Sequence, residues 1–278
     1  MPKLPEAPSS IQKGVPLKML LDKVAIMQLG ENLKESLPSF DKNSFVISAM
    51  SGISDLTLKE RSKHIAVALK GCLPNKYSDA LAVLVNSFTP ALEATEGNGL
   101  SGLFYMPHCE FISQYGVDPQ YNRDEDSFEI SIAAQYELTK RFTCEFSIRS
   151  FLIEKEKRTL KVLNSWIMDS DPHVRRLCSE GTRPRLPWAS KIDSFVKDPN
   201  ICLPILEQLK NDEDLYVRRS VANHFGDIAK DHLDFALDLC EQWLNGASKE
   251  LKWVIRHAVR HPFKKGNKRA IALRLAAK

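Results

Sequence analysis

The sequence predicts an all-α protein made of short helices, and three observations support this prediction. Between almost all breaks in the chain, apolar residues recur at spacings of three and four, the period of a helix with one buried face. Few stretches alternate apolar and polar residues as a strand would. The breaks, such as "DSDP", "NDED" and "NGAS", are short and rich in residues that end or begin helices.

Ten stretches show the helical spacing. They cover residues 17–36, 45–53, 56–73, 77–88, 127–152, 157–169, 200–211, 215–233, 234–246 and 249–266. The stretch from about 94 to 124 is the least regular, and we expect a long loop there with a short helix inside it. We expect residues 1–14 to form an N-terminal tail and residues 15–278 to form a single domain.

A repeated arginine motif predicts the architecture. The segments "TKRFTCEF", "VRRLCSEG", "VRRSVANH" and "VIRHAVRH" align on Arg141, Arg176, Arg219 and Arg256, at intervals of 35, 43 and 37 residues. Periods of about 40 with two helices each are typical of HEAT-like solenoids, in which helix pairs bury their apolar faces by stacking on their neighbours. The sequence therefore predicts a HEAT-like repeat α-solenoid with a concave face.

The charge of the chain is unevenly distributed. Residues 139–278 hold 27 Lys and Arg against 18 Asp and Glu, whereas residues 1–138 hold 12 against 17. A basic C-terminal half favours a polyanion such as DNA as the partner of a concave face, and solvated helix faces are the alternative.

The sequence shows no signal for export or for a membrane. No segment resembles a signal peptide or approaches 18 consecutive apolar residues, and the six cysteines include no CxxC pair. We therefore expect a cytoplasmic monomer with reduced, buried thiols and no membrane partner.

The same repeats contain a column of polar residues. The fourth residue after each aligned arginine is Glu145, Glu180, Asn223 or Arg260, and Asp227 follows Asn223 by one helical turn. Carboxylates weaken a face that binds a polyanion, so they either tie repeats together as salt-bridge partners or stabilise a cation. A DNA base alkylated on a ring nitrogen is such a cation. Its glycosidic bond is weak because the base leaves neutral, and carboxylates can stabilise the oxocarbenium-like sugar and direct a water.

Residues 179–188, "SEGTRPRLPW", combine a carboxylate, two arginines, two prolines and a tryptophan. We expect a helix to end at Gly181 and the prolines to stiffen the following loop, so that Arg183, Arg185 and Trp188 are held against DNA. The candidate phosphate contacts are Arg141, Arg176, Arg183, Arg185, Arg219 and Arg256. Ties between repeats are the alternative role for each of these arginines.

Nothing in the sequence predicts a metal or a cofactor. His257 and His261 are four residues apart, but no third ligand is near them in sequence, so we expect a solvated or phosphate-facing role for both. The chain contains no glycine-rich phosphate loop, nucleophile elbow or dinucleotide fingerprint.

Four segments resemble the AlkC family of HEAT-like-repeat DNA glycosylases. They are "TKRFTCEFSIRSFL" (139–152), "DPHVRRLCSEGTRPRLPW" (171–188), "VRRSVANHFGDIAKDH" (217–232) and "KWVIRHAVRHPFKKG" (252–266). The resemblance covers about residues 15–278 and is strongest from 139 onward. Many family members continue into an immunoglobulin-like domain, whereas this sequence stops at "ALRLAAK", and Gly226 and Ser150 depart from the residues expected at their positions.

The resemblance implies a bacterial base-excision repair enzyme that removes N3-methylated bases, chiefly 3-methyladenine and also 3-methylcytosine, from double-stranded DNA. It places the family's catalytic acidic positions on Glu145, Glu180 and Asp227 and its lesion contact on Trp188, and it implies catalysis without full base flipping. Two other functions stay open. One is a non-catalytic HEAT scaffold that binds nucleic acid or protein. The other is a lyase, for which the matched motifs show no lysine at a catalytic position.

Overall fold

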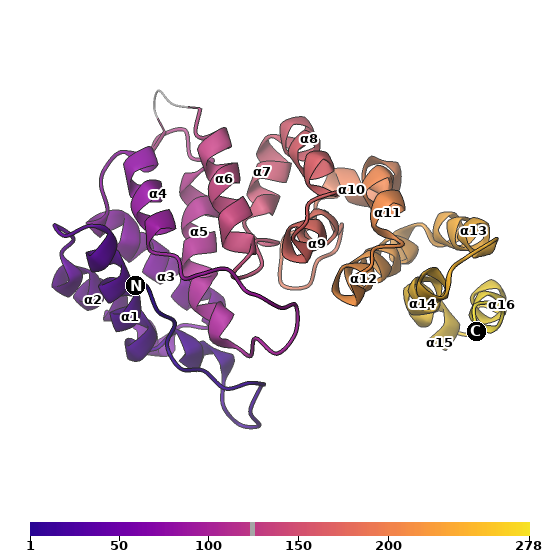
Figure 1. Ribbon diagram of the computed structural model, residues 1–278, viewed down its shortest axis with the longest axis horizontal. Coiled ribbons are helices and arrows are strands. Elements are labelled where there is room, and N and C mark those ends of the chain that lie inside the picture. Colours follow the sequence, from indigo (N-terminus) through magenta and orange to yellow (C-terminus); the bar gives the residue numbers. More distant parts are fainter. Residues whose placement is uncertain (123–125) are drawn as a thin grey trace. The chain divides into compact units, whose positions relative to one another are not determined.

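The computed structural model describes residues 1–122 and 126–278 of the chain (Figure 1). Every regular element in these two ranges is a helix, so the all-α prediction is confirmed. The chain divides into two compact units, Met1–Phe151 and Leu152–Lys278, and the boundary falls inside a helix. A single domain over residues 15–278 stays a prediction.

The N-terminal unit contains long helices and short 3₁₀ turns. The α-helices are α1 (Lys23–Ser36), α2 (Lys42–Met50), α3 (Leu58–Cys72), α4 (Tyr77–Asn86), α5 (Met106–Tyr115), α6 (Phe128–Thr139) and α7 (Ile148–Glu154), which contains the boundary; the 3₁₀ helices are η1 (Leu17–Leu21), η2 (Ile53–Asp55) and η3 (Ser101–Tyr105). The irregular stretch over about 94–124 contains η3 and α5, so a short helix lies within it as predicted. Residues 123 and 124 of this stretch lie outside the described residues.

Side-chain caps set where several of these helices begin. The Asp22 carboxylate accepts a hydrogen bond from the Ala25 backbone N–H and starts α1, so the predicted helix over 17–36 is divided at this residue. The core beneath these helices combines aliphatic side chains with aromatic rings. Its fully buried rings include Phe40, Phe45, Tyr77, Tyr105 and Phe111.

The predicted helix over 127–152 is wrong. Residues 140–147 form turns between α6 and α7, so Glu145 does not follow Arg141 along one helix face. Local polar contacts replace helical ones here: Thr143 Oγ1 donates to Glu145 Oε2, and Ser147 Oγ lies 3.2 Å from the Cys144 carbonyl oxygen. Short hydroxyl side chains compete with the helical backbone pattern in this way.

The C-terminal unit is a series of helix pairs. Its elements after α7 are α8 (Glu156–Trp166), α9 (Pro172–Gly181), α10 (Asp193–Lys197), η4 (Pro199–Ile201), α11 (Leu203–Leu209), α12 (Leu215–Asp231), α13 (Leu233–Leu244), α14 (Lys249–Ala258), α15 (Arg260–Lys264) and α16 (Lys268–Ala276). Helix α9 packs on α8, α12 on α11 and α14 on α13, while α9, α12 and α14 lie side by side in that order (Figure 1). This is the predicted helical repeat fold.

Arg175 ties two of these repeats together. Its guanidinium donates to both carboxylate oxygens of Asp212, at 2.6 and 3.0 Å, and Asp212 lies in the turn before α12. The sequence analysis gave this role of joining repeats, as an alternative, to the aligned arginines such as Arg176. Arg175 is the residue directly before Arg176. Adjacent helical residues lie about 100° apart, so Arg176 lies on a different face.

The predicted helix over 249–266 is also divided, at Val259. Pro262 has no N–H to donate to the Ala258 carbonyl, so α14 ends at Ala258 and α15 begins at Arg260. Arg260 therefore does not continue the helix of Arg256.

Two further expectations concern the whole described chain. No helix in residues 1–122 or 126–278 is long and apolar enough to span a membrane. The six cysteines are free thiols, five of them buried and Cys72 half-buried, as predicted.

Candidate active site

Helices α9 and α12 each place one carboxylate in the interior of the C-terminal unit. Pro172 occupies the first turn of α9 and the Asp171 carboxylate accepts from the His173 N–H, so the start of this helix is fixed. Glu180 lies near its other end with 5% of its surface exposed, and Asp227 on α12 is 2% exposed. Buried carboxylates are stable only when they are paired or hydrogen-bonded.

Arg183 joins the two carboxylates. Its Nη1 donates to Glu180 Oε1 at 2.6 Å and its Nε donates to Asp227 Oδ2 at 2.7 Å. Arg183 is 8% exposed and therefore lies inside the unit. The sequence proposed Arg183 as a phosphate contact, and the structure instead places it as a tie between α9 and α12.

The remaining carboxylate oxygens also have partners. Ser220 Oγ donates to Glu180 Oε2 at 2.6 Å, and Lys230 Nζ donates to Asp227 Oδ1 at 2.8 Å. Arg176 Nη2 lies 3.6 Å from Glu180 Oε1. Lys230 is the most solvent-exposed of these partners, since 48% of its side chain is accessible.

These charges keep Glu180 ionised. Burial raises the pKa of Glu180, but the positive charges of Arg176 and Arg183 and the Ser220 hydrogen bond outweigh it, so that the net pKa lies below the ordinary value. The pair of carboxylates can therefore stabilise a positive charge that develops beside it.

His224 lies in the same buried network as a neutral ring. Burial lowers the pKa of His224 to about 4, and Nδ1 lies 3.0 Å from the Ser179 carbonyl oxygen. Because a carbonyl oxygen only accepts, Nδ1 carries the proton. This contact fixes α12 against the residue that precedes Glu180.

The loop after α9 exposes Trp188. Thr182 caps α9 and its Oγ1 donates to the Cys178 carbonyl at 2.7 Å, which fixes the exit from the helix. Trp188 then adopts a left-handed backbone with φ 67°, the one non-glycine among the described residues to do so, and its side chain is 66% exposed. Arg185 donates to both oxygens of Asp231, at 2.5 and 2.6 Å, and so is tied to the end of α12.

Glu145 lies in the N-terminal unit, in the turns before α7. Glu145 is 8% exposed, and its carboxylate accepts a hydrogen bond from Thr143 Oγ1. The structure thus brings Glu180 and Asp227 together through Arg183 and places Glu145 in the other unit.

The other predicted arginines differ in their surroundings. Arg141 donates to the carbonyl oxygens of Thr89 and Glu137, and Arg256 donates to that of Ala277, so both are tied within their own units. Arg176 lies over the Tyr216 ring at 4.9 Å. Arg219 is exposed and has no hydrogen-bond or salt-bridge partner within the described residues.

The sequence argument missed Ser220 and Lys230. Each bonds a carboxylate directly, and Lys230 is a lysine of the matched motif at 217–232. Spacing could have found both: Lys230 is one turn after Asp227, and Ser220 is two turns before it on the same face.

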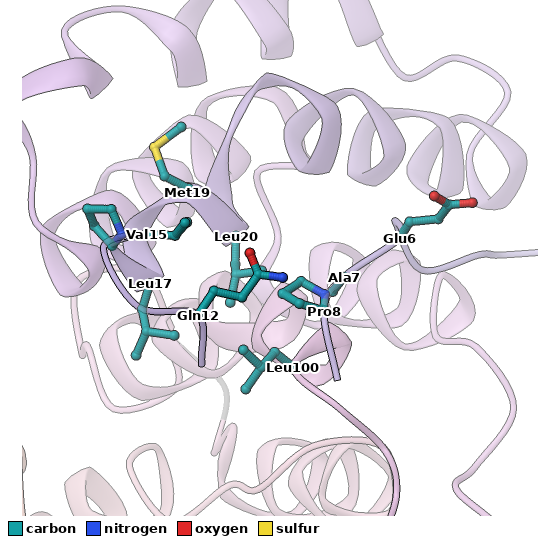
Figure 2. A pocket seen from close by; sticks show the side chains of 10 residues that line it. Glu6, Ala7, Pro8, Gln12, Val15, Leu17, Met19, Leu20 and Leu100 are labelled. Atoms are coloured by element: carbon teal, nitrogen blue, oxygen red, sulfur yellow. The ribbon is translucent and has the colours of Figure 1, made fainter. Parts of the chain in front are cut away.

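A separate groove of about 450 Å³ lies in the N-terminal unit (Figure 2). Pro8, Gln12, Leu17, Leu20 and Leu100 are among the residues that line it. None of the predicted site residues contributes to this groove, so it is not part of the candidate active site.

Comparison with known proteins gives two extensive similarities. The chain is 38% identical over 258 residues to the uncharacterized protein YhaZ of Bacillus subtilis, which covers 92% of this chain and 67% of YhaZ. It also matches the structure of Pseudomonas fluorescens alkylpurine DNA glycosylase AlkC bound to DNA containing an abasic site analog. The TM-score of that match is 0.81 at 35% identity, over 94% of this chain and 68% of the other. No protein-family model matches the chain.

Proposed function

The chain belongs to the AlkC family of HEAT-like-repeat DNA glycosylases, and we propose that it is an alkylation-repair DNA glycosylase acting on double-stranded DNA. The observation that carries this proposal is the pair of buried carboxylates, Glu180 and Asp227, bridged by Arg183, with the exposed Trp188 in the loop that follows α9. In a scaffold that only binds DNA, the two buried carboxylates would serve only as a tie between α9 and α12 through Arg183. In an enzyme that forms a cationic sugar, they also stabilise the positive charge.

The substrates are cationic N3-alkylated bases, with 3-methyladenine first and 3-methylcytosine second. The bond between C1′ and the base nitrogen breaks with its electron pair going to the base, which leaves neutral. The positive charge then lies on the sugar, where an ionised carboxylate stabilises it. Water adds to C1′ and gives its proton to a carboxylate, which yields the free base and an abasic site.

The carboxylates divide this work. Asp227 orients the water, because its Oδ1 is bonded to Lys230, the exposed partner that a substrate can most easily displace. Glu180, whose pKa is held low, stabilises the positive charge. Trp188 contacts the lesion from its exposed loop, and the backbone is held so that the carboxylates reach the sugar without full base flipping.

Lys230 favours a second candidate activity, a lyase that opens the abasic sugar through a Schiff base. Such a step needs an uncharged amine, because the nitrogen lone pair attacks C1′. Lys230 Nζ donates to Asp227 Oδ1 at 2.8 Å, so this hydrogen bond must break before the amine can attack C1′. We therefore propose a monofunctional glycosylase that releases the base by hydrolysis.

Methylated duplex DNA tests both activities in one reaction. The wild-type protein should release free 3-methyladenine, detected by liquid chromatography with mass detection, and should leave unnicked abasic DNA. Binding of the duplex without release of a base would favour the scaffold. A borohydride-trapped covalent complex that disappears in Lys230→Ala would establish the lyase.

A further inference from the structure

Several arginines of the C-terminal unit have no carboxylate partner among the described residues, and the charges of three of them act on the same histidine. Arg175, Arg183, Arg185 and Arg269 each form salt bridges. In contrast, Arg219 on α12, Arg260 on α15 and Arg274 on α16 have no carboxylate oxygen within salt-bridge distance among the described residues. Arg274 lies over the Phe263 ring at 4.4 Å, and Arg260 bonds only neutral oxygens.

All three arginines lie close enough to one histidine for their charges to act on it. His257 on α14 is half-buried and stacks on Trp253, with the ring centroids 5.0 Å apart and the planes 10° from parallel. Burial first, and then the charges of Arg260, Arg219 and Arg274, lower the pKa of His257 to about 4. Three separate elements thus bring unneutralised positive charge to a single ring.

Asn223 on α12 determines the tautomer of that ring. Its Oδ1 lies 3.0 Å from Arg260 Nη2 and 3.1 Å from His257 Nε2. Arginine has no acceptor, so the Asn223 atom that faces Arg260 must be the oxygen. His257 therefore donates through Nε2, and its Nδ1 has a free lone pair that can take a proton without breaking the bond to Asn223.

The cluster is next to the candidate active site. The pKa of Arg260 is lowered, first by burial and then by the positive charge of Arg183, and the negative charge of Asp227 partly opposes this. Arg260 therefore lies close to two members of the candidate active site. Gly226 leaves the space for this approach, since a Cβ there would lie 3.5 Å from Arg260 Nη1. A longer side chain at position 226 would occupy the place of the guanidinium.

We propose that Arg219, His257, Arg260 and Arg274 form a binding site for a phosphodiester group of the DNA backbone, and that His257 takes up a proton when the phosphate binds. The inference rests on the proposed function, because it names DNA as the ligand. A phosphate supplies the missing negative charge, and arginines bind its oxygens with charge-assisted hydrogen bonds. It also opposes the three charges that disfavour protonated His257, so that Nδ1–H becomes a further donor.

The charged groups around His257 fix the sign of the pH effect. They are Arg219 from α12, Arg260 from α15 and Arg274 from α16, while Asn223 and Trp253 are neutral. The pKa of His257 is about 4 in the free protein and rises when the phosphate is bound. DNA affinity should therefore increase as the pH falls from 8 toward 5.

The test measures binding of an undamaged fluorescent duplex by anisotropy at several salt concentrations. The double variant Arg219→Gln/Arg274→Gln should bind more weakly, and the slope of log affinity against log salt should flatten by about one for each lost contact. Arg269→Gln is the matched control, because Arg269 is on α16 like Arg274 but pairs with Asp238 and Glu241. Thermal melts of each variant check that it is folded.

A slope and affinity equal to wild type in the double variant would overturn the site. The proton uptake is tested with His257→Gln, which should lose the part of the pH dependence between 8 and 5 that wild type shows; an unchanged pH profile would overturn it. A wild-type protein that binds no duplex and releases no base would instead refute the proposed function. Intact release with an unaltered salt slope would refute only this phosphate site.

Discussion

Arg183 should be the side chain on which the C-terminal unit depends most for stability. Its replacement by methionine removes one buried positive charge and two hydrogen bonds, to Glu180 at 2.6 Å and to Asp227 at 2.7 Å. Breaking a buried ion pair from one side costs about 3–5 kcal/mol, because the remaining charge is left buried. Arg176, Ser220 and Lys230 still contact the carboxylates, so we expect the lower end, about 3 kcal/mol.

The pH dependence of this loss follows from Glu180. Its folded-state pKa lies below the ordinary value of 4.5, so its contribution to stability is present above that pH and is lost as the pH falls through the folded pKa. Without Arg183, only Arg176 and Ser220 oppose the effect of burial, so the pKa of Glu180 is higher in the variant than in wild type. The deficit of Arg183→Met should therefore be largest near pH 7 and smaller at pH 4, where Glu180 becomes protonated.

Urea unfolding followed by circular dichroism at pH 7 and pH 4 measures both effects. Arg183→Lys keeps the charge and should lose less stability than Arg183→Met. Arg185→Met is the matched control, because Arg185 pairs with Asp231 at a much more exposed place and should change stability far less. A deficit in Arg183→Met no larger than in this control, or equal at the two pH values, would refute the reasoning.

Three other substitutions or reactions test separate parts of the structure. Gly226→Ala should raise the unfolding free energy by about 0.5–1 kcal/mol, because glycine is a poor helix former and the new Cβ meets only ordinary contacts at 3.5 Å or more; a destabilised variant in urea unfolding would contradict this. Trp188→Gly should melt close to wild type, because glycine accepts the left-handed backbone, yet release much less methylated base; wild-type release would show that Trp188 does not contact the lesion. A thiol reagent should label the native protein at Cys72 alone, and slowly, because burial raises the pKa of that thiol; labelling of a second cysteine before unfolding would show that the buried thiols are accessible.

The helical repeat could be predicted because its signals are local and recur. Apolar spacing marked α12, the arginine repeat and the Asp-rich turns marked both α9 and α12, and Pro262 could have marked the division between α14 and α15. The turn at 140–147 could not be found in this way. Its apolar spacing continues that of α6, and the hydroxyl contacts of Thr143 and Ser147 that replace the helical pattern leave no such signal.

The two carboxylates were found from their spacing, but their environment was not. Arg183 and Asp227 are 44 positions apart, and no local pattern shows which of six arginines turns inward. The doublet of Arg175 and Arg176 illustrates the difficulty, because one position decides between a tie to Asp212 and a place beside Glu180. Such choices depend on the stacking of one repeat on the next.

The most direct test of the account compares base release by wild type and Asp227→Asn. Single-turnover release of 3-methyladenine from methylated duplex DNA is measured with enzyme in excess, and binding of the same duplex is measured by anisotropy. Loss of one group that stabilises a charged transition state costs about 100-fold or more in rate. We expect a loss of at least that size with DNA affinity retained, whereas release at the wild-type rate would show that Asp227 does not act in catalysis.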